Sequence, residues 1–205
     1  MPKGLSVGLV VAAAIEVADE SGLAAVTMAA VAQRCGFTTM SLYRHVASKD
    51  ELVRRMLDEV LGTAPTLEST DWRAGLEQWS RAMLAILDRH PWGIDIPITG
   101  ILGTHAQLSW LDRGLEAMAE TGLDDGSKAE IVLLLNGYVF WALRLEVALT
   151  TAPPQPLVPP QFDLEDLPYL RRAYQDRQFE GDSTPEEHFR LGLNRTLDGI
   201  AASIP

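Results

Sequence analysis

The chain has 205 residues, with 17 lysines and arginines against 28 aspartates and glutamates, which gives a formal net charge of −11. Hydrophobic residues make up 47% and charged residues 22%, a balance that excludes a disordered or collagen-like chain. Proteins that coat nucleic acid without sequence preference are basic, so the acidic charge excludes that class. Any nucleic-acid contact must therefore be confined to a small part of the surface and must form against the acidic charge of the whole chain.

The single cysteine, Cys35, excludes an internal disulfide and a cysteine-rich zinc site, and we interpret it as a small core residue. No histidine pair has metal-ligand spacing, so the sequence predicts no metal site and no cofactor. The apolar stretch 7–17 is too short to span a bilayer, and acidic residues follow it. These features predict a cytoplasmic protein with no membrane partner.

Helical periodicity extends over nearly the whole chain, which predicts an all-α fold. The first predicted helix covers 5–21 and the second 28–35, with Thr27 as its N-cap and Gly36 after its end. A third is expected over 39–46 after Thr38. A fourth begins at a capping box formed by Ser48 and Glu51.

Turn composition over 62–70 marks a boundary, which predicts two domains, residues 1–62 and 63–205. In the second, helices are expected over 71–89 and 104–120, with a broken segment at 91–103. A further helix is expected over 127–150, from a capping box of Ser127 and Glu130. The proline-rich stretch 151–162 is predicted to be non-helical, a short helix is expected over 164–175, and a last helix begins at Thr184-Pro185.

Residues 27–49 form a helix, a tight glycine turn and a second helix, the pattern of a helix-turn-helix. The apolar residues expected to pack with the first helix of the chain are Val31, Phe37, Leu42 and Val46. This packing leaves polar side chains on the outer face of the second helix, where they can reach phosphates and base edges: Thr38, Thr39, Ser41, Tyr43, Arg44 and His45. Lys49 lies where a further backbone contact is expected.

These residues carry a resemblance to a known family. The segments Cys35-Gly36-Phe37, Leu42-Tyr43-Arg44-His45-Val46 and Ser48-Lys49-Asp50-Glu51-Leu52, with Thr27, resemble the DNA-binding domain of the tetracycline-repressor family over about residues 5–62. His90-Pro91-Trp92 and residues 189–200 are similar to the tetracycline-repressor-like C-terminal domain. The resemblance implies operator contacts from Thr27, Thr38, Thr39, Met40, Ser41, Tyr43, Arg44, His45 and Lys49.

The charge is divided unevenly between the two predicted domains. Residues 1–62 carry 6 basic and 7 acidic groups, a net of −1, and the remainder carries 11 basic and 21 acidic groups, a net of −10. Because the first domain has so few cations, we expect operator affinity to depend only weakly on salt.

The second domain contains aromatic and polar residues that suggest a small-molecule pocket, although each could equally be an ordinary core residue. Asn136, Phe140 and Arg144 follow one another at helical spacing, so their polar groups face a cavity, a dimer interface or an acidic partner. His90, at the end of a helix, is interpreted as a capping residue. The candidate effector-binding residues are Trp79, Met83, Trp92, His105, Trp110, Asn136, Phe140, Trp141 and Arg144.

The function predicted is a transcriptional repressor that is not an enzyme. It would bind a palindromic double-stranded DNA operator as a homodimer, through the 127–150 helix and the C-terminal helix, and a small apolar effector would release it. The alternative is an all-α small-molecule-binding protein or enzyme without DNA binding. Against it, no nucleophile–base pair, carboxylate dyad or phosphate loop has usable spacing. A transcriptional activator is a further alternative.

Overall fold

The computed structural model describes residues 4–97, 103–151, 163–175 and 184–205. Within these ranges the chain forms helices and no strand, so the predicted all-α class is confirmed. The helices are α1 Val7–Ser21, α2 Met28–Cys35, α3 Thr39–Tyr43, α4 Lys49–Leu61, α5 Trp72–Arg89, α6 His105–Ala117, α7 Asp125–Thr151, α8 Pro168–Gln175 and α9 Pro185–Ala201, with two short 3-10 helices, η1 Leu23–Ala25 and η2 Pro91–Asp95.

Side-chain caps determine where the N-terminal helices begin. The Thr27 hydroxyl accepts a hydrogen bond from the N–H of Ala30 at 3.1 Å, and Ser48 accepts from Glu51 at 3.1 Å. Each hydroxyl provides an acceptor that the first helical turn lacks. The Glu51 carboxylate accepts from the N–H of Ala47 at 2.7 Å, one residue before the partner expected in a capping box.

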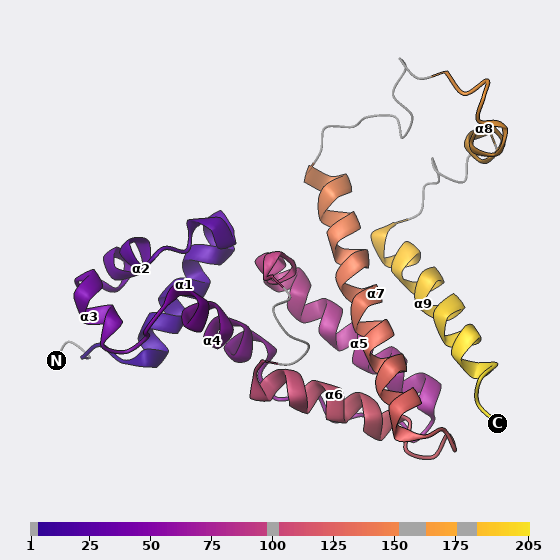
Figure 1. The fold of residues 1–205 in the computed structure, drawn as a ribbon, viewed down its shortest axis with the longest axis horizontal. Coiled ribbons are helices and arrows are strands. Elements are labelled where there is room, and N and C mark those ends of the chain that lie inside the picture. Colours follow the sequence, from indigo (N-terminus) through magenta and orange to yellow (C-terminus); the bar gives the residue numbers. More distant parts are fainter. Residues whose placement is uncertain (1–3, 98–102, 152–162, 176–183) are drawn as a thin grey trace.

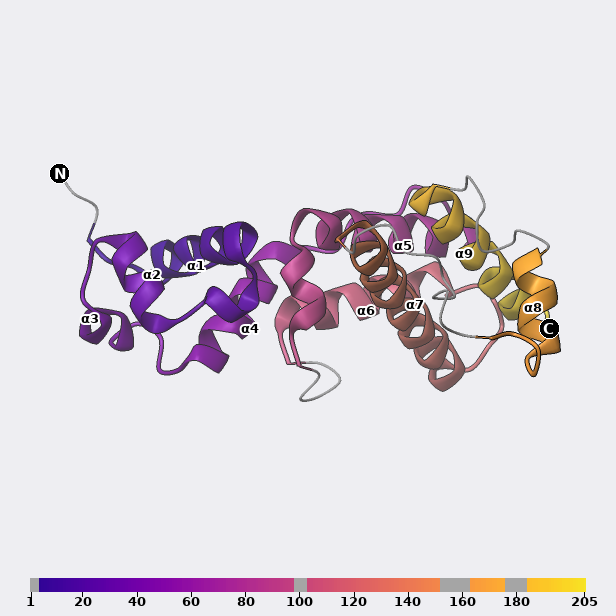
Figure 2. The same cartoon turned by 90° about the horizontal axis from the view of Figure 1, so that it is seen from above.

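Two hydrophobic clusters fill the interior, and α4 contributes to both. The first, built on α1, α2, α3 and the first half of α4, includes Val10, Ala14, Val31, Leu42, Val46, Leu52 and Met56. The second joins α5, α6, α7 and α9 with the last turn of α4, and includes Leu57, Leu61, Leu76, Trp79, Trp110, Leu135, Leu143 and Leu197. Figures 1 and 2 show α1, α2 and α3, which contribute to the first cluster, at one end of an elongated molecule and α9 at the other.

The long helix α7 is apolar on more than one side. Val132, Leu135, Val139 and Leu143 are at most 1% exposed and pack in the second cluster, while Leu134, Trp141 and Leu145 remain exposed. Within the described residues, Asp125–Ala148 is the one helix apolar and long enough to cross a membrane, with mean hydropathy 1.6. The core helix of a globular protein meets the same criteria, and α7 packs against α5, α6 and α9.

Several predicted boundaries were wrong. The third helix ends at Tyr43, because the N–H of His45 bonds to the carbonyl of Leu42 at 2.8 Å in a tighter turn. The capping box predicted at Ser127 does not form; α7 begins at Asp125, and Asp124 accepts from the N–H of Ser127 at 3.0 Å. The segment 151–162 was expected to be non-helical, but Thr151 is the last residue of α7. Residues 152–162 lie outside the described residues, as do residues 98–102 of the predicted broken segment.

Candidate nucleic-acid interface and internal cavity

The turn between α2 and α3 is closed by backbone hydrogen bonds. Gly36 has φ 74°, in the left-handed region that favours glycine, and its N–H bonds to the carbonyl of Gln33 at 3.1 Å. The N–H of Phe37 bonds to the carbonyl of Ala32 at 2.9 Å, which completes a Schellman motif. This turn redirects the chain sharply into α3.

Leu42 in the short helix α3 and Val46, just after it, anchor this segment in the first hydrophobic cluster, where they are at most 1% exposed. Phe37 was expected in the same core, but it is 38% exposed and does not belong to the first hydrophobic cluster. The structure places the predicted DNA contacts on the outside of this end of the molecule. Thr27, Thr38, Met40, Tyr43, Arg44 and Lys49 are exposed, whereas Thr39, Ser41 and His45 are half-buried.

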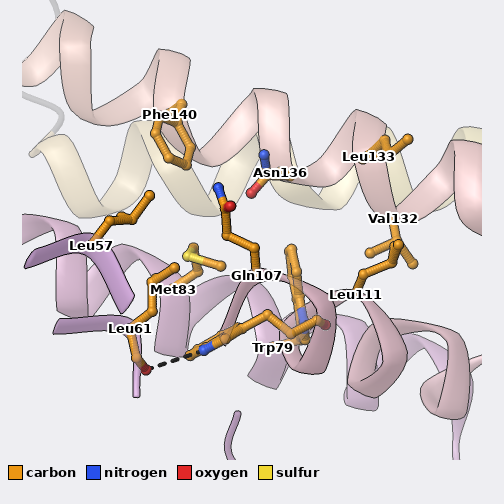
Figure 3. Close-up of a pocket in the computed structure, with 11 residues that line it drawn as sticks. Leu57, Leu61, Trp79, Met83, Gln107, Leu111, Val132, Leu133, Asn136 and Phe140 are labelled. Carbon is orange, nitrogen blue, oxygen red and sulfur yellow. Dashed lines mark hydrogen bonds between the residues drawn. The ribbon is translucent and has the colours of Figure 1, made fainter. Parts of the chain in front are cut away.

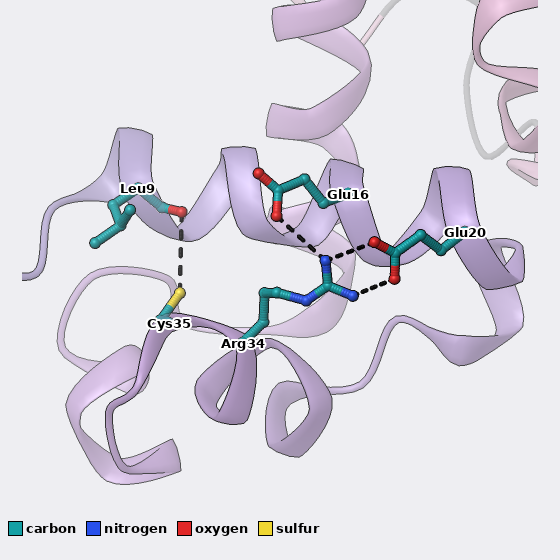
Figure 4. Close-up of polar contacts among 5 residues, drawn as sticks. All are labelled: Leu9, Glu16, Glu20, Arg34 and Cys35. Carbon is teal, nitrogen blue, oxygen red and sulfur yellow. Dashed lines mark hydrogen bonds and ion pairs between the residues drawn. The ribbon is translucent and has the colours of Figure 1, made fainter.

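Two of the cations near this surface are already paired with carboxylates. The Arg34 guanidinium bonds to both oxygens of Glu20 and lies 3.3 Å from a Glu16 oxygen (Figure 4). Arg55 bonds to Glu51 at 2.8 Å. Arg44 and Lys49, by contrast, form no ion pair with any residue in the described ranges.

The Arg34 ion pair has a consequence for Glu20. The hydrogen bond from the guanidinium lowers the pKa of the Glu20 carboxyl, because it stabilises the ionised form.

On the same helix as Arg34, the Cys35 thiol lies 3.9 Å from the carbonyl oxygen of Leu9, and burial raises the pKa of this thiol. A thiol whose pKa is raised is a poor redox sensor, in agreement with the interpretation of Cys35 as a packing residue.

A cavity of about 70 Å³ lies between α4, α5, α6 and α7 (Figure 3). Its lining is uncharged and mostly apolar: Leu57, Leu61, Trp79, Met83, Gln107, Trp110, Leu111, Val132, Leu133, Asn136 and Phe140. Trp79 and Trp110 meet edge to face, with ring centroids 5.9 Å apart. The Trp79 indole donates to the carbonyl of Trp110 at 2.8 Å, and the Trp110 indole donates to the carbonyl of Leu61 at 3.2 Å.

Two carboxamides supply the polar groups of this cavity. The Gln107 carbonyl oxygen accepts from the N–H groups of Gly103 and Thr104 at 2.8 and 3.1 Å, so its NH₂ group remains without a bond to the described residues. The Asn136 side chain, on the facing helix, forms no hydrogen bond to any of them. Both groups are therefore available to a ligand.

Five of the nine candidate effector residues line the cavity, namely Trp79, Met83, Trp110, Asn136 and Phe140. The other four lie elsewhere. Trp92 is buried in the first hydrophobic cluster, and Arg144 donates to the carbonyl of Ile94 at 2.5 Å. His105 is exposed at the start of α6, and Trp141 is 60% exposed on α7.

Sequence reasoning missed six lining residues: Leu57, Leu61, Gln107, Leu111, Val132 and Leu133. The Thr104–Gln107 capping box is a recognisable pattern and marks the start of α6, but it does not indicate that Gln107 faces a cavity. His90, predicted to cap a helix, is the C-cap residue of α5, where its N–H bonds to the carbonyl of Ile86 at 3.1 Å, and its Nδ1 lies 2.8 Å from an oxygen of Asp19. Within the described residues no group of three or more potential metal ligands lies together.

Comparison with known proteins assigns both halves of the chain. Residues 10–56 match the family described as bacterial regulatory proteins, tetR family, and residues 64–204 match the tetracyclin repressor-like, C-terminal domain. The HTH-type transcriptional repressor DrrR1 of Streptomyces coeruleorubidus is 32% identical over 209 residues, which cover 96% of this chain and 77% of that protein.

The chain belongs to the tetR family of bacterial regulatory proteins. It is therefore a helix-turn-helix transcription regulator that binds DNA, and α2 and α3 are the helix-turn-helix. Two solved structures share the fold. ActR of Streptomyces coelicolor, in complex with (S)-DNPA, has a TM-score of 0.78 at 22% identity and covers 98% of this chain and 99% of its own. BioQ with its double-stranded DNA operator has a TM-score of 0.65 at 23% identity, covering 97% and 99%.

Proposed function

We propose that this tetR-family protein is a cytoplasmic transcriptional repressor that binds a palindromic operator as a homodimer and is released by a small uncharged effector. Residues 1–62 form the DNA-binding domain and residues 63–205 the effector-binding and dimerisation domain. The relative DrrR1 is named a transcriptional repressor, which supports repression over activation for this protein. The observation that carries the proposal is the position of α4, which joins the DNA-binding core to the cavity.

The operator contacts proposed are Thr27, Thr38, Thr39, Met40, Ser41, Tyr43, Arg44, His45 and Lys49. Their support is the outward-facing α3, anchored by the buried Leu42, and the two unpaired cations Arg44 and Lys49 on the same end of the molecule. An unpaired cation can neutralise a phosphate without first breaking an internal ion pair.

The dimer contact proposed is the exposed face of α7 and α9. Leu134, Tyr138, Trp141 and Leu145 follow one stripe of α7, and Leu134 and Trp141 are 57% and 60% exposed. A groove of about 510 Å³ runs beside this stripe and is lined by Trp141 of α7 and Leu191 of α9. Contiguous apolar surface of this kind is covered by a partner in stable proteins.

The cavity indicates the chemical class of the effector. Its lining contains no formal charge, and burying a charged ligand there would cost far more than burying a neutral one. The free NH₂ group of Gln107 and the unbonded carboxamide of Asn136 suit a ligand with hydroxyl or carbonyl groups. Trp79 and Trp110 suit an aromatic ring. We therefore infer an uncharged aromatic compound with one or two polar substituents.

The size of the cavity suggests how the effector would act. At about 70 Å³ it is much smaller than the roughly 300 Å³ that a drug-sized ligand needs. An effector would therefore bind an expanded conformation in which α4 and α7 move apart. Because Leu52 and Met56 fix α4 in the DNA-binding core, displacement of Leu57 and Leu61 would reorient that core and change the separation of the two recognition helices.

The DNA-binding part is tested with a duplex selected by the purified protein from a random pool. Tyr43→Ala and Lys49→Ala should each weaken binding at least about tenfold, at roughly 1–3 kcal/mol for each lost contact. Lys128→Ala, which removes a cation paired with Asp125 at the start of α7, is the control outside the DNA-binding domain and should not change affinity. Unchanged circular dichroism and mass would show that the variants are folded. Wild-type affinity in both test variants would refute the assignment of these residues.

The effector part is tested with a panel of uncharged aromatic compounds that carry one or two hydroxyl or carbonyl groups, each paired with its carboxylated analogue. Uncharged members should release the protein from the selected duplex, and their charged analogues should not. Asn136→Leu should weaken release by the active compound about tenfold, the effect of one lost hydrogen bond of about 1.4 kcal/mol. Release by the carboxylated compounds alone would contradict the proposal.

A further inference from the structure

The recognition segment lacks most of the side chains that distinguish bases. Residues 37–43 read Phe-Thr-Thr-Met-Ser-Leu-Tyr and contain no arginine, lysine, asparagine, glutamine, aspartate or glutamate. Arginine and lysine select guanine, asparagine and glutamine select adenine, and the acidic residues select cytosine. The one base feature read by apolar contact is the C5-methyl group of thymine.

The hydroxyl groups at the start of α3 are largely used within the protein. Thr38 Oγ1 lies 2.9 Å from Ser41 Oγ and also accepts a hydrogen bond from the N–H of Ser41 at 3.3 Å. Ser41 is half-buried, as is Thr39. Hydroxyl groups moreover contact several bases without strong preference, so they add little discrimination.

Met40 is the most exposed of the large apolar side chains in this segment. It is 71% exposed, on a helix whose opposite face is held by the fully buried Leu42. Phe37, at 38%, and Tyr43, at 49%, are also exposed, so three large apolar side chains gather at this end of the molecule. The two unpaired cations Arg44 and Lys49 lie at the same end and favour a polyanion as the partner that covers them.

We propose that Met40 reads thymine by packing on its C5-methyl group in the major groove of each operator half-site. The inference rests on the proposed function, because it assumes that α3 enters the groove. Beyond DNA binding itself, the proposal specifies one base pair of each half-site: a T·A pair is selected next to Met40, and Met40 determines that selection.

The test uses the selected duplex with each thymine replaced in turn by deoxyuridine, which removes only the methyl group. For the wild-type protein, one symmetry-related thymine pair should be sensitive, with a loss of about fourfold per half-site, as expected for one buried methyl group. Met40→Ala should bind the thymine and uracil duplexes equally. Met40→Leu, which keeps an apolar side chain, should retain discrimination, and Leu108→Ala on α6 is the matched control for an exposed apolar residue.

The outcomes separate the two proposals. If no duplex is enriched from the pool, the proposed function itself fails. If a duplex is bound but no thymine position is sensitive to uracil, the assignment of Met40 is overturned while DNA binding stands. Equal uracil sensitivity in the wild-type and Met40→Ala proteins also overturns it, because another residue would then contact the methyl group.

Discussion

The carboxylate of Asp19, near the end of α1, accepts a hydrogen bond at 2.6 Å from the indole N–H of Trp92 in η2. The same oxygen lies 2.8 Å from Nδ1 of His90. Trp92 is 3% exposed and packs in the DNA-binding core, whereas Ile94, two residues later, packs in the second hydrophobic cluster. A single turn of 3-10 helix therefore joins the two cores, beside the connection made by α4.

Breaking this contact should destabilise the protein. A hydrogen bond to a charged group contributes about 1.5–3 kcal/mol, so Asp19→Ala and Trp92→Phe should each lower the free energy of unfolding in urea by about that amount or more. The double variant should lose less than the sum of the two, because both single changes remove the same hydrogen bond. Strict additivity would show that the contact contributes no stability.

The close crossing of α6 and α7 depends on Gly114. A Cβ atom added at this position would lie 2.6 Å from Cγ1 of Val132, on the helix that lines the cavity. Gly114→Ala should therefore cost about 1–3 kcal/mol of unfolding free energy, as overpacking does. Gly8→Ala is the control, because nothing lies within 4 Å of its added Cβ and the helix should gain up to about 1 kcal/mol. Equal effects of the two changes, measured by thermal unfolding, would contradict the close packing.

Below pH 4.5 the Glu20–Arg34 ion pair should make stability fall with pH. The pKa of Glu20 is lowered in the folded protein from its ordinary 4.5, so the ion pair stabilises the fold above that value and is lost as pH falls through the folded pKa. Arg34→Gln should reduce this dependence, seen as a smaller shift of the urea midpoint between pH 5 and pH 3. An identical shift in both proteins would show that the pair does not contribute.

The exposed face of α7 offers a direct test of the dimer. Trp141→Glu should convert the protein to a monomer in solution, because it places a charge in the centre of the proposed contact. Leu108, on α6, has a similar exposed fraction of 51%, so Leu108→Glu is the matched control and should remain dimeric. Mass measurement by light scattering distinguishes the two. If the Trp141→Glu protein remained a dimer, the dimer contact would have to lie on another surface.

The helix boundaries show which parts of the fold are encoded locally. The N-cap of α2 at Thr27 and the start of α9 at Thr184-Pro185 depend on hydrogen bonds over three residues, and both were predicted. The start of α7 was predicted wrongly because Asp124 and Ser127 both offer a cap, and sequence alone does not rank them. Local chemistry thus predicts that a helix exists better than it predicts its first residue.

The cavity could be predicted only in part, because its walls come from distant segments. The four-residue spacing of Asn136 and Phe140 correctly placed both on one face of α7. Arg144 continues the same spacing but extends beyond the cavity to the carbonyl of Ile94. Leu57 and Leu61 look like ordinary core residues in the sequence. Their contact with the cavity arises from the crossing of α4 with α6, where Asp58 accepts from the N–H of Ala106 at 2.8 Å.

The most direct test of this account is selection of duplex DNA from a random pool by the purified wild-type protein. A dimer with two recognition helices should enrich an inverted repeat, with half-sites separated by about 10–10.5 base pairs or a multiple of that length. Enrichment of a single unrepeated site, or of no sequence above the starting pool, would contradict it.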